Sequence, residues 1–131
     1  MPQAMPTSPS VIGNVVNING YKGWQIKVKI SHYDPALGGT NCGHWDTKTN
    51  TCTSRMANGE RWQDYYTAGN AIACPKELAF GTRILLEGRI YTCKDRGGAI
   101  RYLGNNTYWI DILAIRTGFP FGIIKDAMIL K

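Results

Sequence analysis

The alternation of apolar and polar positions predicts a chain built almost entirely of short strands. In WQIKVKISHY, residues 24–33, Ile26, Val28 and Ile30 alternate with polar residues, as in a strand with one buried face. A single helical turn is predicted near residues 113–118. Further short strands are predicted at residues 71–74, 82–88, 89–95, 108–113 and 123–131. Many short strands with glycine turns and little helix favour an all-β fold, a small β-barrel or sandwich.

Two regions depart from this strand pattern. Residues 34–68 are polar and rich in glycine, asparagine and threonine, and so long a loop in a compact domain usually carries a function or a disulfide. Residues 1 to about 20 are poor in charge, and we expect a linker whose end pairs as a short strand. We therefore divide the 131 residues into a linker or N-terminal extension, 1–22, and one barrel domain, 23–131.

The composition is that of an ordinary soluble globular protein, with 44% apolar and 18% charged residues. No apolar run is long enough to span a membrane. The first ten residues, MPQAMPTSPS, lack the basic cluster and apolar stretch of a signal peptide. We expect either that an export signal precedes this chain or that the chain is the C-terminal module of a longer protein.

The net charge of +6 suggests an anionic partner, either a nucleic acid or an acidic cell-wall polymer. The fifteen lysine and arginine residues are scattered and form no basic run of the kind that binds nucleic acid. The charge alone does not choose between the two partners.

Four cysteines suit two disulfides, and so an oxidising compartment. Of the three possible pairings we favour Cys42–Cys52 with Cys74–Cys93. The first would close the polar loop CGHWDTKTNTC and stabilise it by roughly 2–3 kcal/mol. The alternative is a zinc site of Cys42, His44 and Cys52, but these residues lack the paired C-x-x-C spacing and a fourth ligand. We therefore expect no metal.

Asp111 is the acid that fits its surroundings least, because apolar residues flank it in WIDIL. Burial would raise the pKa of such a carboxyl and keep it protonated, as general-acid catalysis at a glycosidic bond requires. The alternative is that strand alternation turns Asp111 outward to solvent.

Three further acids have equally open interpretations. Asp95, in YTCKDRGGAI, either forms an ion pair or accepts main-chain amides at a turn, or belongs to a site in which Gly97 and Gly98 let the backbone approach a ligand. Asp34 follows the first strand in HYDP, and Glu60 lies in ANGERW, where a solvated loop acid is the commoner role. The loop aromatics either line a groove or cap the end of the barrel: Trp45, Trp62, Tyr65 and Tyr66.

Taken in order, four segments resemble the three-aspartate (3D) domain, a double-psi β-barrel similar to that of membrane-bound lytic transglycosylase A. They are SHYDP, ACPKELAFGTRILLEGRIYTCKDRGGAI, WIDIL and FGIIKDAMIL. MANGERW, LAFGTR, DRG and ID also resemble rare lipoprotein A and, more distantly, the barwin-like and expansin barrels. The resemblance extends from about residue 24 to the C-terminus and implies a six-stranded barrel.

The resemblance also implies roles for single residues. Asp111 matches the catalytic aspartate of the lytic transglycosylases, and Asp95 matches the acid of the D-x-G-G-A-I motif. Asp34 matches the acid of Y-D-P, and Glu60 the acid of A-N-G-E in rare lipoprotein A. Where the three-aspartate pattern has an acid, this chain has Cys74, which we expect to be diverted to a disulfide with Cys93.

The expected function is therefore that of a monomeric, extracytoplasmic peptidoglycan lytic transglycosylase without a cofactor. Asp111 and Asp95 are the expected catalytic residues, and peptidoglycan glycan strands are the expected partner. The residues expected to bind substrate are Tyr33, Asp34, Glu60, Arg96, Gly97 and Gly98. A non-catalytic wall-binding or wall-loosening module, supported by the missing acid at Cys74, is the alternative. A nucleic-acid-binding barrel rests on charge alone, and we expect no such binding.

Overall fold

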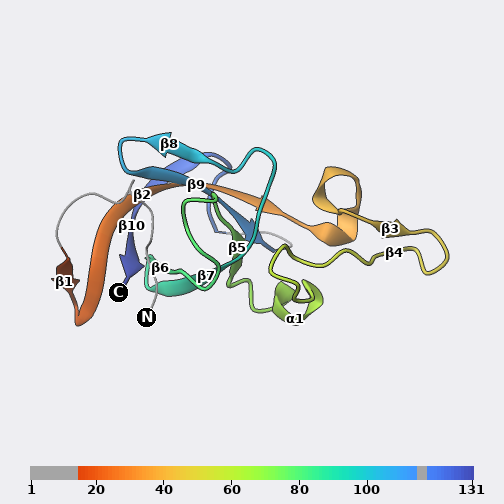
Figure 1. The fold of residues 1–131 in the computed structure, drawn as a ribbon, viewed down its shortest axis with the longest axis horizontal. Helices are drawn as coiled ribbons and strands as arrows, with labels where there is room; N and C mark the ends of the chain where they lie inside the picture. The colour runs from red at the N-terminus through yellow and green to blue at the C-terminus, as the bar shows by residue number, and fades with distance from the viewer. Residues whose placement is uncertain (1–14, 115–117) are drawn as a thin grey trace.

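The computed structural model describes residues 15–114 and 118–131, and its regular secondary structure is mostly strand (Figure 1). The single short helix, α1, is Gln63–Tyr66, and two 3-10 turns lie at Pro35–Leu37 and Gly39–Asn41. The strands are β1 (Val16–Ile18), β2 (Tyr21–Tyr33), β3 (Trp45–Asp46), β4 (Thr51–Cys52), β5 (Ala71–Ala73), β6 (Arg83–Leu86), β7 (Arg89–Asp95), β8 (Tyr102–Gly104), β9 (Thr107–Leu113) and β10 (Ile123–Leu130).

Six of these strands close into a ring, in the order β2-β10-β6-β7-β5-β9 and back to β2. The pairs β2–β9 and β5–β7 are parallel, and the other four pairs in the ring are antiparallel. β1 and β8 add to β2 and β9 outside the ring. Closure leaves the ring without a free strand edge. The predicted small all-β barrel with short helical turns and a long inserted loop is confirmed.

β2 begins at Tyr21, three residues before the predicted start at Trp24. Ile18 pairs directly with Tyr21, and Asn19 and Gly20 between them both take positive φ, 53° and 86°. Asn-Gly is the preferred sequence for such a two-residue hairpin turn. The predicted short strand at the end of the linker is therefore β1. The helical turn predicted near 113–118 falls partly on residues 115–117, which lie outside the described residues.

The apolar faces of the strands fill the ring. Ile26, Val28 and Ile30 of β2 are at most 3% exposed and pack with Ile110 and Ile112 of β9. The Cys74–Cys93 disulfide lies inside this core and joins β7 to the residue that follows β5. It closes a loop of about twenty residues, for which a stabilisation of about 3 kcal/mol is typical. This predicted pairing is confirmed.

The long loop forms a second, smaller structure at one side of the barrel. Its β3–β4 hairpin extends away from the barrel in Figure 1, and the Cys42–Cys52 disulfide, also as predicted, closes that hairpin. Trp62 and Met56 are buried against Leu113 at the end of β9, with Trp45, Tyr65 and Tyr66 packed around them. These aromatic residues thus form a second small core that covers the barrel, the second of the two predicted roles, and Trp62 also lines a cleft beside it, as in the first.

Two disulfides are typical of proteins exposed to an oxidising compartment. Within the described ranges, no helix has both the length and the apolar character needed to cross a membrane.

Candidate active site

A cleft of about 790 Å³ lies between the barrel wall and the long loop. The barrel contributes residues of β2 and β9 and the segment after β7, and the loop contributes residues 40–43 and 54–56. Six of the predicted site residues line it: Tyr33, Asp95, Arg96, Gly97, Gly98 and Asp111. Asp34 and Glu60 are not among the lining residues.

The strand register places the two central acids in one row. Ala73 of β5 stands opposite Asp95 of β7 on one side and opposite Asp111 of β9 on the other. Ser31 of β2 stands opposite Asp111 in the parallel β2–β9 pair. Neighbouring strands are about 4.8 Å apart, so the backbones of Asp95 and Asp111 are separated by two strand spacings. The row Asp95–Ala73–Asp111–Ser31 forms the barrel side of the cleft.

An irregularity in the β5–β7 pairing brings Asp95 into this row. Ile72 stands opposite Cys93, but the next residue of β5, Ala73, stands opposite Asp95. The register therefore advances by two residues on β7 and by one on β5, as at a β-bulge. In an uninterrupted ladder Lys94 would stand opposite Ala73, and Asp95 would fall on the other face with Cys93.

Asp111 is half-buried and, among the described residues, has one side-chain hydrogen-bond donor, the Ser31 hydroxyl, whose Oγ lies 2.9 Å from Asp111 Oδ1. The Trp109 indole N–H donates to the same Ser31 oxygen at 2.9 Å and fixes its position. Burial raises the pKa of Asp111, and the charge of Asp95 adds to this, while Ser31 and His32 act in the opposite direction without cancelling it. Strand alternation does turn Asp111 away from the barrel core, but the side chain faces the cleft.

Asp95 is held by three donors. Its Oδ2 accepts the Tyr33 hydroxyl at 2.7 Å, and its Oδ1 accepts the amides of Ala57 and Arg96, each at 2.8 Å. Burial and the neighbouring Asp95 carboxylate raise the pKa of Tyr33, so this phenol stays protonated as a donor. Asp95 is therefore a fixed negative charge beside Asp111.

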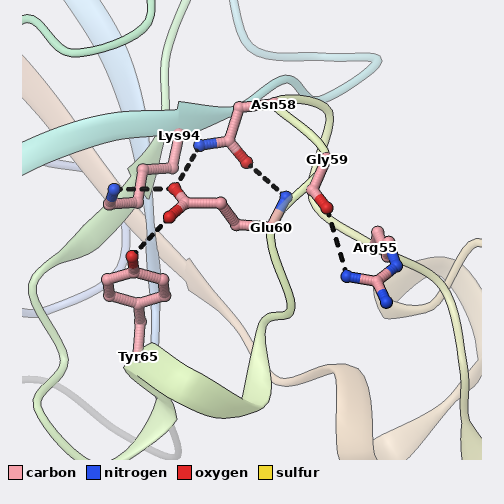
Figure 2. Close-up of polar contacts among 6 residues, drawn as sticks. All are labelled: Arg55, Asn58, Gly59, Glu60, Tyr65 and Lys94. Carbon is pink, nitrogen blue, oxygen red and sulfur yellow. Dashed lines mark hydrogen bonds and ion pairs between the residues drawn. The ribbon is translucent and has the colours of Figure 1, made fainter.

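Glu60 lies in a separate polar network at the C-terminal end of β7, where it binds Lys94, the neighbour of Asp95 (Figure 2). Its carboxylate accepts hydrogen bonds from Lys94 Nζ at 2.8 Å, from the Tyr65 hydroxyl at 2.6 Å and from the Asn58 side-chain amide. These three donors, with Lys94 the strongest, lower the pKa of Glu60 to about 2. Asn58 and Tyr65 belong to the long loop and Lys94 belongs to β7, so Glu60 holds the loop against this strand.

Asp34 is buried and caps the first 3-10 turn of the loop. Its Oδ1 accepts the Ala36 amide at 3.0 Å and the Tyr66 hydroxyl at 2.8 Å. The hydrogen bond and the charge of Asp34, together with burial as the largest effect, raise the pKa of Tyr66 to about 12. Asp34 thus ties α1 to the end of β2.

Arg96 and the glycine pair Gly97–Gly98 are the remaining predicted site residues. The Arg96 guanidinium donates to the carbonyl oxygens of Leu78 and Cys74 and lies 4.0 Å from the Phe80 ring centre. A Cβ on Gly97 would come within 2.7 Å of Ile100 Cγ1, whereas Gly98 borders open space. Gly98 is therefore the more open of the two glycines along the cleft.

Ser31 and Trp109 are the site residues that the sequence did not reveal. Both fall on outward positions in the alternation of their strands, where the sequence gives no sign that the structure buries Ser31. Only the parallel β2–β9 register, which no local pattern encodes, places Ser31 beside Asp111.

The cleft therefore combines one half-buried carboxyl of raised pKa with one fixed carboxylate, an arrangement suited to proton transfer. Within residues 15–114 and 118–131, no cluster of histidine, cysteine or acidic residues is arranged to hold a metal ion. The sequence matched no protein-family model, and no curated protein was significantly similar to it.

Proposed function

We propose that this protein is a peptidoglycan lytic transglycosylase that uses Asp111 as its single acid and base. One observation supports this most: Asp111 lines an open cleft, is half-buried and has its pKa raised by burial and by Asp95. Such a carboxyl keeps its proton at a pH where an exposed aspartate has lost it. The resemblance of DRGGAI and WIDIL to the three-aspartate domain assigns the same residue.

In the proposed reaction, Asp111 donates its proton to the oxygen that links N-acetylmuramic acid C1 to the next N-acetylglucosamine. The C1–O bond breaks, and its electron pair stays on the leaving oxygen, which becomes a hydroxyl. The ionised Asp111 then takes the proton of the muramyl 6-hydroxyl as that oxygen bonds to C1. The product carries a 1,6-anhydro ring, and no water is consumed. The carboxyl spacing that distinguishes retaining from inverting hydrolases therefore does not apply.

Asp95 and Ser31 have supporting roles in this scheme. The charge of Asp95 favours the protonated form of Asp111 before the reaction. The Ser31 hydroxyl donates to the Asp111 oxygen and orients the carboxyl, while Trp109 fixes the hydroxyl. The exposed main chain at Gly98 borders the cleft where a sugar would lie.

Incubation with purified sacculi, followed by mass spectrometry of the soluble fragments, tests this function. We expect muropeptides with 1,6-anhydro ends, which are lighter than hydrolysis products by one water. Fragments with reducing ends would contradict the transglycosylase and indicate a hydrolase.

The non-catalytic wall-binding module is the competing outcome of the same experiment. Cys74, buried in a disulfide, stands where the three-aspartate pattern has an acid, and this favours the alternative. Against it, Trp45, Tyr65 and Tyr66 of the long loop pack against the second small core and do not line the cleft, which leaves Trp62 as the loop aromatic that borders it. Retention of the protein on sacculi with no soluble product would establish the binding module.

A further inference from the structure

The loop segment 55–60 is fastened to the end of β7 by several contacts. The Asn58 amide donates to the Lys94 carbonyl at 3.1 Å, and the Ala57 amide donates to Asp95 at 2.8 Å. The Glu60 carboxylate binds the Lys94 ammonium at 2.8 Å (Figure 2). This segment is therefore held in a fixed position at the edge of the cleft.

Arg55 lies at the start of this segment and lines the cleft. Its Nη1 donates to the Gly59 carbonyl oxygen at 3.2 Å, which fixes the guanidinium against the fastened segment (Figure 2). No other N–H group of Arg55 has a hydrogen-bond partner among the described residues. Arg55 is exposed, so its remaining donors are open to a ligand.

Arg55 differs in this respect from the other arginine of the cleft. Four charged residues line the cleft within the described ranges: Arg55, Asp95, Arg96 and Asp111. Arg96 uses its guanidinium on main-chain oxygens and on the Phe80 ring. The Asp95 carboxylate would repel a negatively charged ligand, and among the described lining residues Arg55 is the cation whose donors are free to bind one.

We infer that Arg55 is a specificity-determining residue that binds a carboxylate carried on the lactyl group of N-acetylmuramic acid. This inference rests on the proposed function. Two sources carry that chemistry: the lactyl carboxylate itself in peptide-free strands, and the carboxylates of the stem peptide in peptide-bearing strands. A planar guanidinium forms two parallel hydrogen bonds to a carboxylate, so the contact would also set the direction in which the strand lies.

The test compares four substrates: peptide-free and peptide-bearing glycan strands, each native and with its carboxylates converted to methylamides. We expect the wild type to lose roughly 10- to 100-fold in kcat/KM on the methylamides, mainly through KM. A loss on peptide-free strands would identify the lactyl carboxylate as the group that Arg55 binds, and a loss on peptide-bearing strands would identify the stem-peptide carboxylates. Arg55→Gln should treat native and methylamide strands alike, and Arg55→Lys should regain part of the preference. Arg61→Gln, at an exposed arginine of the same loop outside the cleft lining, should behave as the wild type.

Equal activity of the wild type on native and methylamide strands would overturn the role of Arg55 and leave the transglycosylase intact. If no strand is cleaved, the proposed catalysis fails, and dissociation constants for the same strands test Arg55 separately. A wild-type preference for native strands that Arg55→Gln abolishes supports the inference in that case, and an unchanged preference in Arg55→Gln overturns it.

Discussion

Asp111 and Glu60 both carry carboxyl groups beside the same barrel, and their surroundings shift the two pKa values in opposite directions. Within the part of the chain that the structure describes, Asp111 accepts one side-chain hydrogen bond, from a neutral serine, and it lies against a cleft where burial raises its pKa. Glu60 accepts hydrogen bonds from a lysine, a tyrosine and an asparagine, and its pKa falls to about 2. A carboxylate surrounded by donors serves to hold structure, whereas a partly buried carboxyl with few donors keeps its proton to a higher pH and can donate it.

The largest effect should come from removing the Asp111 carboxyl. We expect Asp111→Asn to lower the release of anhydromuropeptides by roughly 10²- to 10⁴-fold, since the amide can neither donate the proton to the glycosidic oxygen nor take one up. Quantitative mass spectrometry of sacculus digests measures this loss. Activity close to that of the wild type would show that another group transfers the proton.

The stability of the same variant serves as its control. A raised folded-state pKa means that the wild type loses stability as pH rises from the unfolded value, about 3.9, through the folded value. Asp111→Asn lacks this loss, so at pH 7 we expect its Tm to equal or exceed that of the wild type. A clearly lower Tm would mean that the lost activity reflects damage to the fold.

Glu60→Gln should have a smaller effect, on stability. A lowered folded-state pKa stabilises the protein above the unfolded value of about 4.3, and this contribution is lost as pH falls toward 2. We expect the Tm of Glu60→Gln to lie below that of the wild type at pH 7 and the two to converge near pH 2. Asp64→Asn, at an exposed acid of the same loop, should follow the wild type throughout. A pH-independent gap would assign the effect to packing.

Ser31→Ala should produce the smallest change. The serine hydrogen bond lowers the pKa of Asp111, so its removal should raise that pKa further. Activity that needs protonated Asp111 falls as pH rises through this pKa, and we expect the falling limb of the pH–rate profile to move to higher pH. A shift to lower pH would mean that Ser31 stabilises the protonated form.

Local signals in the sequence predicted an all-β fold of short strands and favoured both disulfides, whereas the choice of a barrel over a sandwich came from the resemblance to the three-aspartate domain. Alternation in β2 identified the buried face, and the cysteine spacing favoured the pairings that formed. The sequence also singled out Asp111 from its apolar neighbours. The place of Asp95 beside it depends on the bulge opposite Ala73, and that of Ser31 on a pairing between strands about eighty residues apart. Neither is a local property of the chain.

Glu60 and Asp34 show that a sequence motif does not by itself fix the role of an acid. Both were predicted to bind substrate from matches to short motifs, and the structure places both outside the lining of the cleft. Tyr65 and Tyr66 are neighbours in α1, and their hydroxyl groups donate to Glu60 and Asp34, respectively. A motif identifies an acid, but the donors around it decide what that acid does.

A carboxyl titration by ¹³C NMR tests the contrast between the two acids most directly. Asp111→Asn and Glu60→Gln assign the two resonances in spectra of the aspartate- and glutamate-labelled protein. We expect Asp111 to titrate above the ordinary aspartate value of about 3.9 and Glu60 at about 2. An Asp111 resonance that titrates at or below the ordinary value would contradict its assignment as the proton donor.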